Sequence, residues 1–302
     1  MNLAIGFFDG VHRGHRRILS QADMALTFAE HPLSVLAPER APALLMTFEE
    51  RLASIRDALR HNSLIKETEK VRALHFTPEF AAMPPAAFAA MLKRDYPDLE
   101  TIYCGPNWNF GAGGSGNASF LINLGFDVRT VPFEHAGPVP NCEGPVPMGE
   151  RVISSTRIRS LLASGGVKEA AEMLGRWYTV QGEVRRGKGR GTELGFPTVN
   201  LHPVNSDLRR LLPFGVYVVD SELGRGIANW GLAPTMGSEA WTNPVFEVYV
   251  IDAVNPILPA NVPASISLSV KAYLRPERKF DTLEALKNQI TDDIELARRE
   301  NC

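Results

Sequence analysis

Cysteine is scarce in this sequence, and the features of a secreted or membrane protein are missing. The 302 residues include three cysteines, Cys104, Cys142 and Cys302, which lie far apart and lack the spacing of a metal site. Their scarcity argues against a disulfide framework and favours a reducing compartment. There is no apolar run of about eighteen residues, the length of a membrane helix, and no signal-peptide pattern at the N-terminus. We therefore expect a cytoplasmic protein with no membrane partner.

An excess of positive charge is also missing. The net charge is −2 at pH 7, whereas proteins that bind nucleic acid through electrostatics are basic. We therefore expect no nucleic-acid partner. The composition, 44% hydrophobic and 22% charged, is typical of a soluble globular protein, and the length favours two domains. Neither property predicts the oligomeric state.

The first half of the chain alternates apolar runs with helical patterns. The apolar runs lie at 3–8, 24–28, 71–76, 101–104 and 126–131. Thr47 and Glu50 have the spacing of a capping box at the start of one helix, and Pro84 and Pro85 suit the start of another. Strands that alternate with helices predict an α/β fold with a parallel sheet.

The pattern changes after Arg176. Short runs rich in valine, tyrosine and isoleucine follow at 178–184, 214–219, 226–230, 245–251 and 265–274, separated by glycine and proline. These runs predict an antiparallel barrel or sandwich, and an apolar stripe over 283–297 predicts a final helix. Because Gly175 also ends a predicted helix, we expect two domains, residues 1–175 and 176–302.

A first candidate site is GFFDGVHRGH, residues 6–15, at the end of the first strand. Ligands of parallel sheets bind beyond the carboxyl ends of the strands. Gly10 and Gly14 let the backbone approach a ligand, and His12 and His15 stand where a helix N-terminus would attract phosphate. Their imidazoles could stabilise charge on a leaving pyrophosphate. A plain turn with exposed histidines and a metal-binding pair are the alternatives.

A second candidate site is GKGRGTELGFPTVN, residues 187–200. A loop so rich in glycine can wrap phosphate with its backbone N–H groups, although it lacks the ending of a Walker A loop. Thr198 and Asn200 are two residues apart at a strand start, so their oxygens could hold Mg²⁺ together with ATP phosphates. A flexible basic loop and a nucleic-acid patch over 185–190 are the alternatives.

Both motifs resemble those of a known enzyme family. FDGVHRGH resembles the signature of HxGH nucleotidylyltransferases, and residues 187–200 resemble that of riboflavin kinases. LTFAEHP (26–32), CGPNWNFG (104–111), ISSTRIR (153–159), FGVYVV (214–219), GIANWGLAPTMG (226–237), FEVYVID (246–252) and LRPERKF (274–280) follow in the expected order. Nearly the whole chain is thus similar to the bacterial bifunctional riboflavin kinase/FMN adenylyltransferases.

The resemblance implies a fold and two activities. A Rossmann-like HxGH nucleotidylyltransferase domain would be followed by an antiparallel riboflavin-kinase β-barrel with a C-terminal helix. The barrel would phosphorylate riboflavin with ATP to give FMN, and the first domain would transfer AMP from ATP to FMN to give FAD. Mg²⁺ would be the cofactor, ATP the co-substrate, and riboflavin, FMN and FAD the substrates and products.

The resemblance also implies roles for individual residues. In the first domain, His12, His15 and Arg159 would be catalytic, and the residues contacting nucleotide or flavin would be Gly6, Phe7, Asp9, Gly10, Gly14, Asn107, Ser155 and Thr156. In the barrel, Glu247 would be the catalytic base, and Thr198 and Asn200 would hold the metal. The residues contacting nucleotide there would be Gly187, Gly189, Gly191, Gly195, Pro197, Thr198 and Asn200.

Some positions depart from the family pattern. Glu30 stands where relatives usually have proline, Asn109 where a basic residue is common, and 255–263 where a D-L-Y-G segment is expected. Two other functions therefore stay open. One is a different HxGH transferase, such as a pantetheine-type adenylyltransferase, fused to a nucleic-acid-binding barrel. The other is a non-catalytic flavin binder or regulator.

Overall fold

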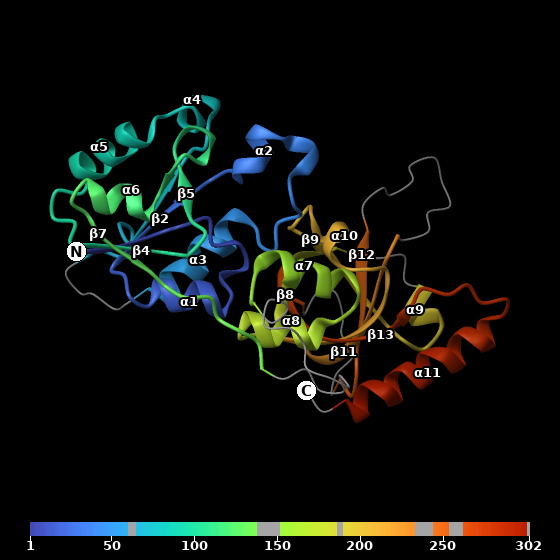
Figure 1. The fold of residues 1–302 in the computed structure, drawn as a ribbon. Helices are drawn as coiled ribbons and strands as arrows, with labels where there is room; N and C mark the ends of the chain where they lie inside the picture. Colours follow the sequence, from blue (N-terminus) through green and yellow to red (C-terminus); the bar gives the residue numbers. More distant parts are fainter. Residues whose placement is uncertain (60–64, 138–151, 186–189, 233–243, 254–261, 301–302) are drawn as a thin grey trace. The chain divides into compact units, whose positions relative to one another are not determined.

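Two compact units make up the chain, Met1–Ser155 and Thr156–Cys302. The structure is a computed structural model, and it describes residues 1–59, 65–137, 152–185, 190–232, 244–253 and 262–300 (Figure 1). Within these ranges, none of the helices combines the length and the apolar character that a membrane span requires.

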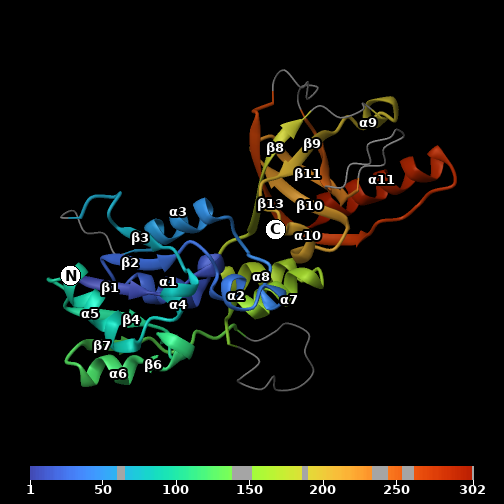
Figure 2. The same ribbon diagram turned by 90° about the horizontal axis from the view of Figure 1, so that it is seen from above.

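The first unit is built on a parallel sheet. Its strands are β1 (Asn2–Ile5), β2 (Met24–Phe28), β3 (Val71–Leu74), β4 (Thr101–Cys104) and β7 (Asp127–Thr130). They lie in the order β3-β2-β1-β4-β7, and Figure 2 shows them side by side. The chain moves outward from β1 to β3 and then returns to the other side of β1 with β4. This reversal makes the β1–β4 junction a topological switch point, where such sheets bind ligands.

Helices cover both faces of this sheet (Figure 1). The helices of the unit are α1 (Arg13–Leu19), α2 (Pro32–Leu36), α3 (Phe48–Ala58), α4 (Pro78–Ala81), α5 (Pro85–Asp95) and α6 (Ala118–Asn123). Apolar residues of α1 and α3 pack in one core cluster with β1 and β2, and those of α5 and α6 pack in another with β1 and β4. A short hairpin, β5 (Asn109–Phe110) and β6 (Gly116–Asn117), completes the described strands of this unit.

The second unit is built on a closed barrel. Its strands are β8 (Tyr178–Arg185), β9 (Val199–Pro203), β10 (Gly215–Ser221), β11 (Gly224–Gly231), β12 (Val245–Val250) and β13 (Ser265–Pro276). They follow the order β10-β11-β12-β9-β8-β13, and every pair is antiparallel. Trp230 stacks on Phe246 at 4.5 Å between ring centres, and both are buried.

Helices lie on the outside of the barrel. They are α7 (Ser155–Ala163), which begins at the unit boundary, α8 (Val167–Leu174), α9 (Arg190–Glu193), α10 (Leu208–Leu211) and α11 (Leu283–Arg299). Ile294 and Ala297 of α11 pack with Val216, Val218 and Ile227 of the barrel. α8 contacts β13 and β8 and ends at Gly175 in the left-handed conformation.

The predicted fold class is confirmed, because a parallel α/β sheet precedes an antiparallel barrel with a final helix. The capping box of Thr47 and Glu50 is present in both directions. The division between residues 175 and 176 stays a prediction. The compact units divide earlier, before α7, so that α8 belongs to the barrel's unit.

The contacts of α8 generate a prediction for two fragments. Residues 156–302 and 176–302 should both give the circular dichroism of a β-barrel. The longer fragment should have the larger free energy of unfolding in urea, by about 2 kcal/mol or more, the scale of burying one apolar side chain. Equal values would mean that α8 does not stabilise the barrel, and an unfolded shorter fragment would move the domain boundary ahead of α8.

Candidate active sites

The loop after β1 has an unusual backbone. Phe8 and Val11 adopt positive φ values of 58° and 37°, and Gly10 between them has a φ of 78°. Residues other than glycine seldom adopt such angles, which cost roughly 1–3 kcal/mol each and persist where the surroundings fix them. We call residues 6–12 the strand-tip loop, because they follow the carboxyl end of β1.

His12 and His15 are held against each other at the start of α1. His12 is the N-cap residue, and its Nδ1 accepts the backbone N–H of His15 at 3.3 Å. The two rings stack with their centres 3.6 Å apart. A Cβ on Gly14 would lie 3.3 Å from the His12 ring, so glycine leaves the room that this stack needs. The sequence predicted a histidine pair here, and the structure brings the two rings together.

The environment of His15 opposes a positive charge. Burial lowers its pKa well below 6.5, and the neighbouring His12 lowers it further. Its ring stands nearly perpendicular to that of Phe8, with the two ring centres 5.4 Å apart. Its Nδ1 is buried without a hydrogen-bond partner among the described residues. His15 is therefore neutral at pH 7 in this structure. An anion at the start of α1 would add a favourable partner for one of its ring nitrogens.

Two other predicted residues of the strand-tip loop, Asp9 and Gly6, make hydrogen bonds that hold the loop, and their contacts with nucleotide stay predictions. The Asp9 carboxylate accepts the backbone N–H of Leu45, at 3.0 and 3.2 Å, and the Asp9 carbonyl accepts the Ser155 hydroxyl at 2.8 Å. Gly6 donates its N–H to the carbonyl of Leu26. These contacts attach the loop to three other segments of the first unit.

Two side chains near this loop were missed by the sequence analysis. Arg51 of α3 is buried beneath it and donates to the carbonyl of Phe7. Glu134 accepts hydrogen bonds from Arg13 at 2.8 Å and Arg17 at 3.2 Å, and so holds α1 in place. Neither residue belongs to a motif, and only the folded topology brings them to the site.

A cavity lies beyond the carboxyl ends of β4 and β7. Its volume is about 400 Å³, and it is lined by Pro106, Thr130, Pro132, Phe133 and His135. In the sheet, β4 and β7 lie on one side of β1, and β2 and β3 lie on the other. Proline and phenylalanine walls suit a flat aromatic ring better than a phosphate.

The residues predicted to contact the flavin and a second set of phosphate oxygens lie in separate segments. Asn107 follows β4 and is exposed, beside Trp108 and Phe110, whose rings stack at 4.8 Å. Ser155 and Thr156 open α7, and Arg159 follows one turn later. The roles of these residues stay predictions.

The second site forms around a row of residues across the barrel. Glu247 of β12 lies directly opposite Asn200 of β9 and Asn229 of β11, and Asn200 in turn lies opposite Arg185 of β8. Side chains alternate along a strand, and Tyr249, two residues after Glu247, packs in the cluster under α11. Glu247 therefore lies on the outer face of the barrel, between two asparagines.

The described part of the glycine-rich loop leads into β9, the strand that carries Asn200. α9 begins beside Gly191, whose carbonyl accepts the N–H of Phe196 at 2.8 Å. A Cβ on Gly191 would lie 3.0 Å from the Thr198 hydroxyl and closer still to the Phe196 carbonyl, so only glycine fits. Gly195 and Pro197 continue the loop into β9, whereas Gly187 and Gly189 fall outside the described residues.

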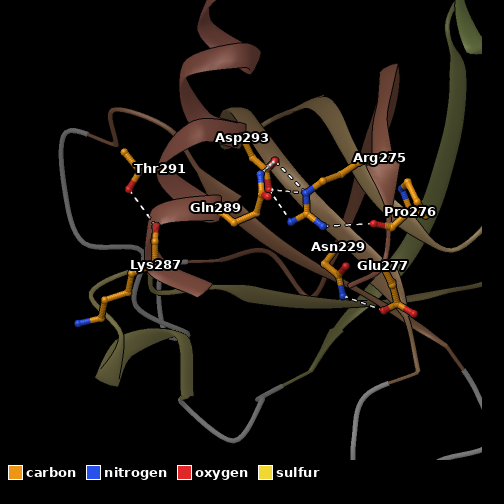
Figure 3. Close-up of polar contacts among 8 residues, drawn as sticks. All are labelled: Asn229, Arg275, Pro276, Glu277, Lys287, Gln289, Thr291 and Asp293. Carbon is orange, nitrogen blue, oxygen red and sulfur yellow. Dashed lines mark hydrogen bonds and ion pairs between the residues drawn. The ribbon is translucent and has the colours of Figure 1, made fainter. Parts of the chain in front are cut away.

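A polar network fixes the end of β13 against α11 (Figure 3). The Arg275 guanidinium donates to both oxygens of the buried Asp293, at 2.9 and 2.7 Å, and Gln289 donates to the same carboxylate. Two residues on, Glu277 accepts a hydrogen bond from Asn229 at 3.3 Å. Asn229 and Glu277 lie in segments that resemble the family, but the sequence does not show that Asn229 joins Glu277 to the Glu247 row.

The lowered pKa of His15 generates a prediction about stability and pH. Its pKa lies near 6.5 in the unfolded chain and well below this value in the folded chain. As the pH falls through 6.5, the unfolded chain therefore takes up a proton that the folded chain does not, and stability is lost. The free energy of unfolding should fall less for His15→Asn than for the parent between about pH 7.5 and about pH 5.5. Equal falls in urea titrations would mean that His15 is not the group responsible.

Comparison with known proteins links both sites to one family. The family model described as FAD synthetase matches residues 1–138, and the model described as riboflavin kinase matches residues 174–300. The bifunctional riboflavin kinase/FMN adenylyltransferase of Escherichia coli (strain K12) is 31% identical, over 99% of this chain and 91% of the relative. The protein of the same name from Bacillus subtilis (strain 168) is 28% identical, over 98% and 91%.

A solved structure gives the same overall likeness. A crystal structure described as a macrolide-efflux protein from Streptococcus pneumoniae matches with a TM-score of 0.78 and 27% identity, over 99% of this chain and 94% of that one. Its description names another activity, but the two family models match the parallel-sheet half and the barrel half in turn. With a curated relative above 30% identity along almost its whole length, the chain belongs to the family of bifunctional riboflavin kinase/FMN adenylyltransferases.

Proposed function

We propose that the two reactions of this family are divided between the two units. As a member of the family, the chain makes FMN from riboflavin and ATP, and FAD from FMN and ATP. Adenylyl transfer is assigned to the strand-tip loop of the first unit, and phosphoryl transfer to the outer face of the barrel. The observation that carries the division is the stacked His12–His15 pair at a helix N-terminus in one unit and the Glu247 row in the other.

Adenylyl transfer needs positioning more than proton transfer. An oxygen of the FMN phosphate attacks the α-phosphorus of ATP, the bond to the β-phosphate breaks, and pyrophosphate leaves. Since the nucleophile is already an anion, no base is needed, and the chain's task is to orient it and to stabilise the leaving charge. His12, His15 and the free N–H groups of α1 are assigned to that charge. Ser155, Thr156 and Arg159 are assigned to a second set of phosphate contacts.

The cavity beyond β4 and β7 fits the base of ATP. Phe133 and two prolines, Pro106 and Pro132, offer apolar surface for a flat ring, and His135 and Thr130 offer polar atoms. Asn107, which follows β4 near the aromatic pair of Trp108 and Phe110, is assigned to FMN. Both assignments agree with the rule that ligands of parallel sheets bind at the switch point.

Phosphoryl transfer needs a group that accepts a proton. The ribityl hydroxyl of riboflavin attacks the γ-phosphorus of ATP, ADP leaves, and the hydroxyl proton goes to the Glu247 carboxylate. Asn200 and Asn229 on either side of Glu247 can hold the reacting groups in line. The loop around Gly191 and Thr198 is assigned to the ATP phosphates, because a glycine-rich loop can wrap phosphate with backbone N–H groups and Gly191 lies close to the Thr198 hydroxyl.

The donor set of the barrel fits Mg²⁺. The Thr198 hydroxyl and the Asn200 amide oxygen are hard ligands. Thr198 directly precedes β9, and Asn200 lies in β9 opposite Glu247. When bound, Mg²⁺ would neutralise charge on the phosphates. Among the described residues, no three or more His, Cys, Asp or Glu side chains gather as a metal site, so we infer that most ligands of the metal come from ATP and water.

Substitutions of residues assigned to adenylyl transfer should affect FAD formation alone. His15→Ala and Arg159→Ala each remove one donor to phosphate charge, so FAD formation from FMN should fall by about 10²-fold. FMN formation from riboflavin should persist, as chromatography of both products would show. Arg16→Ala is the matched control, because Arg16 neighbours His15 on α1 and pairs with the exposed Asp57. Parent rates of FAD formation in both variants would refute the phosphate assignment.

Glu247→Gln should have the opposite selectivity. The variant keeps the shape of the side chain but accepts a proton poorly, so FMN formation should fall by at least about 10²-fold. Supplied with FMN, it should make FAD at the parent rate. Glu222→Gln, a change of an exposed carboxylate on the β10–β11 hairpin, should leave both rates unchanged. An equal loss of both activities would mean that Glu247 supports the fold instead.

If neither FMN nor FAD forms with the parent chain, a flavin binder or regulator is the better interpretation.

A further inference from the structure

One arginine is buried beneath the strand-tip loop, and its hydrogen bonds join two strands. Arg51 of α3 is 1% exposed. Its guanidinium donates to the carbonyl of Phe7 at 2.8 Å, to that of Phe28 at 2.7 Å and to that of Ala29 at 3.2 Å. Its central carbon also lies 3.8 Å from the centre of the Phe7 ring. Phe7 follows β1, Phe28 is the last residue of β2, and Ala29 follows it, so the three carbonyls lie at the carboxyl ends of these two strands.

The start of α3 determines where this side chain points. The reciprocal capping of Thr47 and Glu50 fixes the first turn, and the N–H of Arg51 bonds to the Thr47 carbonyl at 3.1 Å. Leu52 and Ile55 pack in the same core cluster as Phe8 and Val11, so the helix cannot rotate freely. Arg51 thus reaches the strand ends from a rigid support.

The charge of Arg51 is retained despite its burial. Burial lowers its pKa to about 10, while the carboxylates of Asp9 and Glu30 oppose that fall. The guanidinium is therefore positive at neutral pH. It donates to the backbone carbonyls of Phe7, Phe28 and Ala29. Such a planar group with fixed donors can bind several carbonyls at once, which a lysine cannot do equally well.

We propose that Arg51 is a positioning residue for adenylyl transfer. By fixing the Phe7 carbonyl, it sets the direction in which the chain enters the left-handed Phe8 and the turn that ends at His12. The orientation of His12 in turn sets the ring of His15 stacked upon it. This inference rests on the proposed assignment of adenylyl transfer to the strand-tip loop.

The loop needs such a fixed entry because its backbone angles are unfavourable. Asp9 is held by Leu45 and by Ser155, so the middle of the loop has anchors of its own. Phe7 has Arg51 and the hydroxyl of Thr27, which donates to the same carbonyl at 3.2 Å. Without Arg51 the Phe7 carbonyl would keep the Thr27 hydroxyl as its anchor. A shift of about 1 Å at a reacting centre can cost about 10²-fold in rate.

The test compares kinetic constants of full-length variants. Arg51→Met removes the charge and all donors at similar volume, and Arg51→Lys keeps the charge with fewer fixed donors. For FAD formation, kcat should fall about 10²-fold in Arg51→Met and by less in Arg51→Lys, with KM for FMN and ATP changed less than about threefold. Riboflavin phosphorylation by the same samples should be unchanged. Arg56→Met on the same helix is the control and should match the parent.

A double substitution separates positioning from a loss of folding. If Arg51 acts through the histidine pair, adding Arg51→Met to His15→Ala should lower kcat by less than about threefold beyond His15→Ala alone. A full additional 10²-fold loss would overturn the proposal, as would a parent kcat accompanied only by a lower unfolding temperature. A rise in KM without a change in kcat would also overturn it. If Arg51→Met does not fold, Arg51→Lys with His15→Ala provides the same test. A His15→Ala variant with the parent rate would instead refute the site assignment itself.

Discussion

The pairing of β1 with both β2 and β4 is the constraint on which the first unit depends. It makes β1 the central strand and places its carboxyl end where the chain reverses direction across the sheet. The strand-tip loop, the start of α1 and the segment after β4 must then meet at one edge. In a parallel sheet the carboxyl ends of the strands lie along one edge, which is where ligands bind. The N-terminus of α1, with its two histidines, lies at this edge.

In the barrel, strand pairing also brings the predicted site residues together. Antiparallel pairing brings Asn200, Glu247 and Asn229 into one row from three separate strands. Aromatic rings such as Trp230 and Phe246 pack in the barrel interior, whereas the Glu247 row lies on the outer face. α11 covers part of that face, and the Arg275–Asp293 pair fixes the helix to the strand that carries Glu277.

Much of this could be predicted from the sequence because it depends on local patterns. β4 matches its predicted run at both ends, and the capping box at Thr47 is present as expected. Gly14 was expected to let the backbone approach a ligand, and that role stays a prediction, although a Cβ there would lie 3.3 Å from the His12 ring. Arg51 could not be found in this way. A charged residue in the first turns of an amphipathic helix looks like part of the solvent-facing side, and only the tertiary fold shows that three carbonyls surround it. The bond between Asn229 and Glu277 is also a product of barrel closure.

The pairing partners of β1 also set the order in which the chain can fold as it is synthesised. Leu3 pairs with Met24 on one side but with Ile102 on the other, so one edge of β1 has to wait for a distant segment. The barrel has the same property, because β8 closes against β13, its last strand. Contacts between segments distant in sequence form slowly, and unpaired strand edges are prone to wrong association. In both units, therefore, the strand that opens the sheet is completed late, and its exposed edge is where a nascent chain would most need the help of a chaperone.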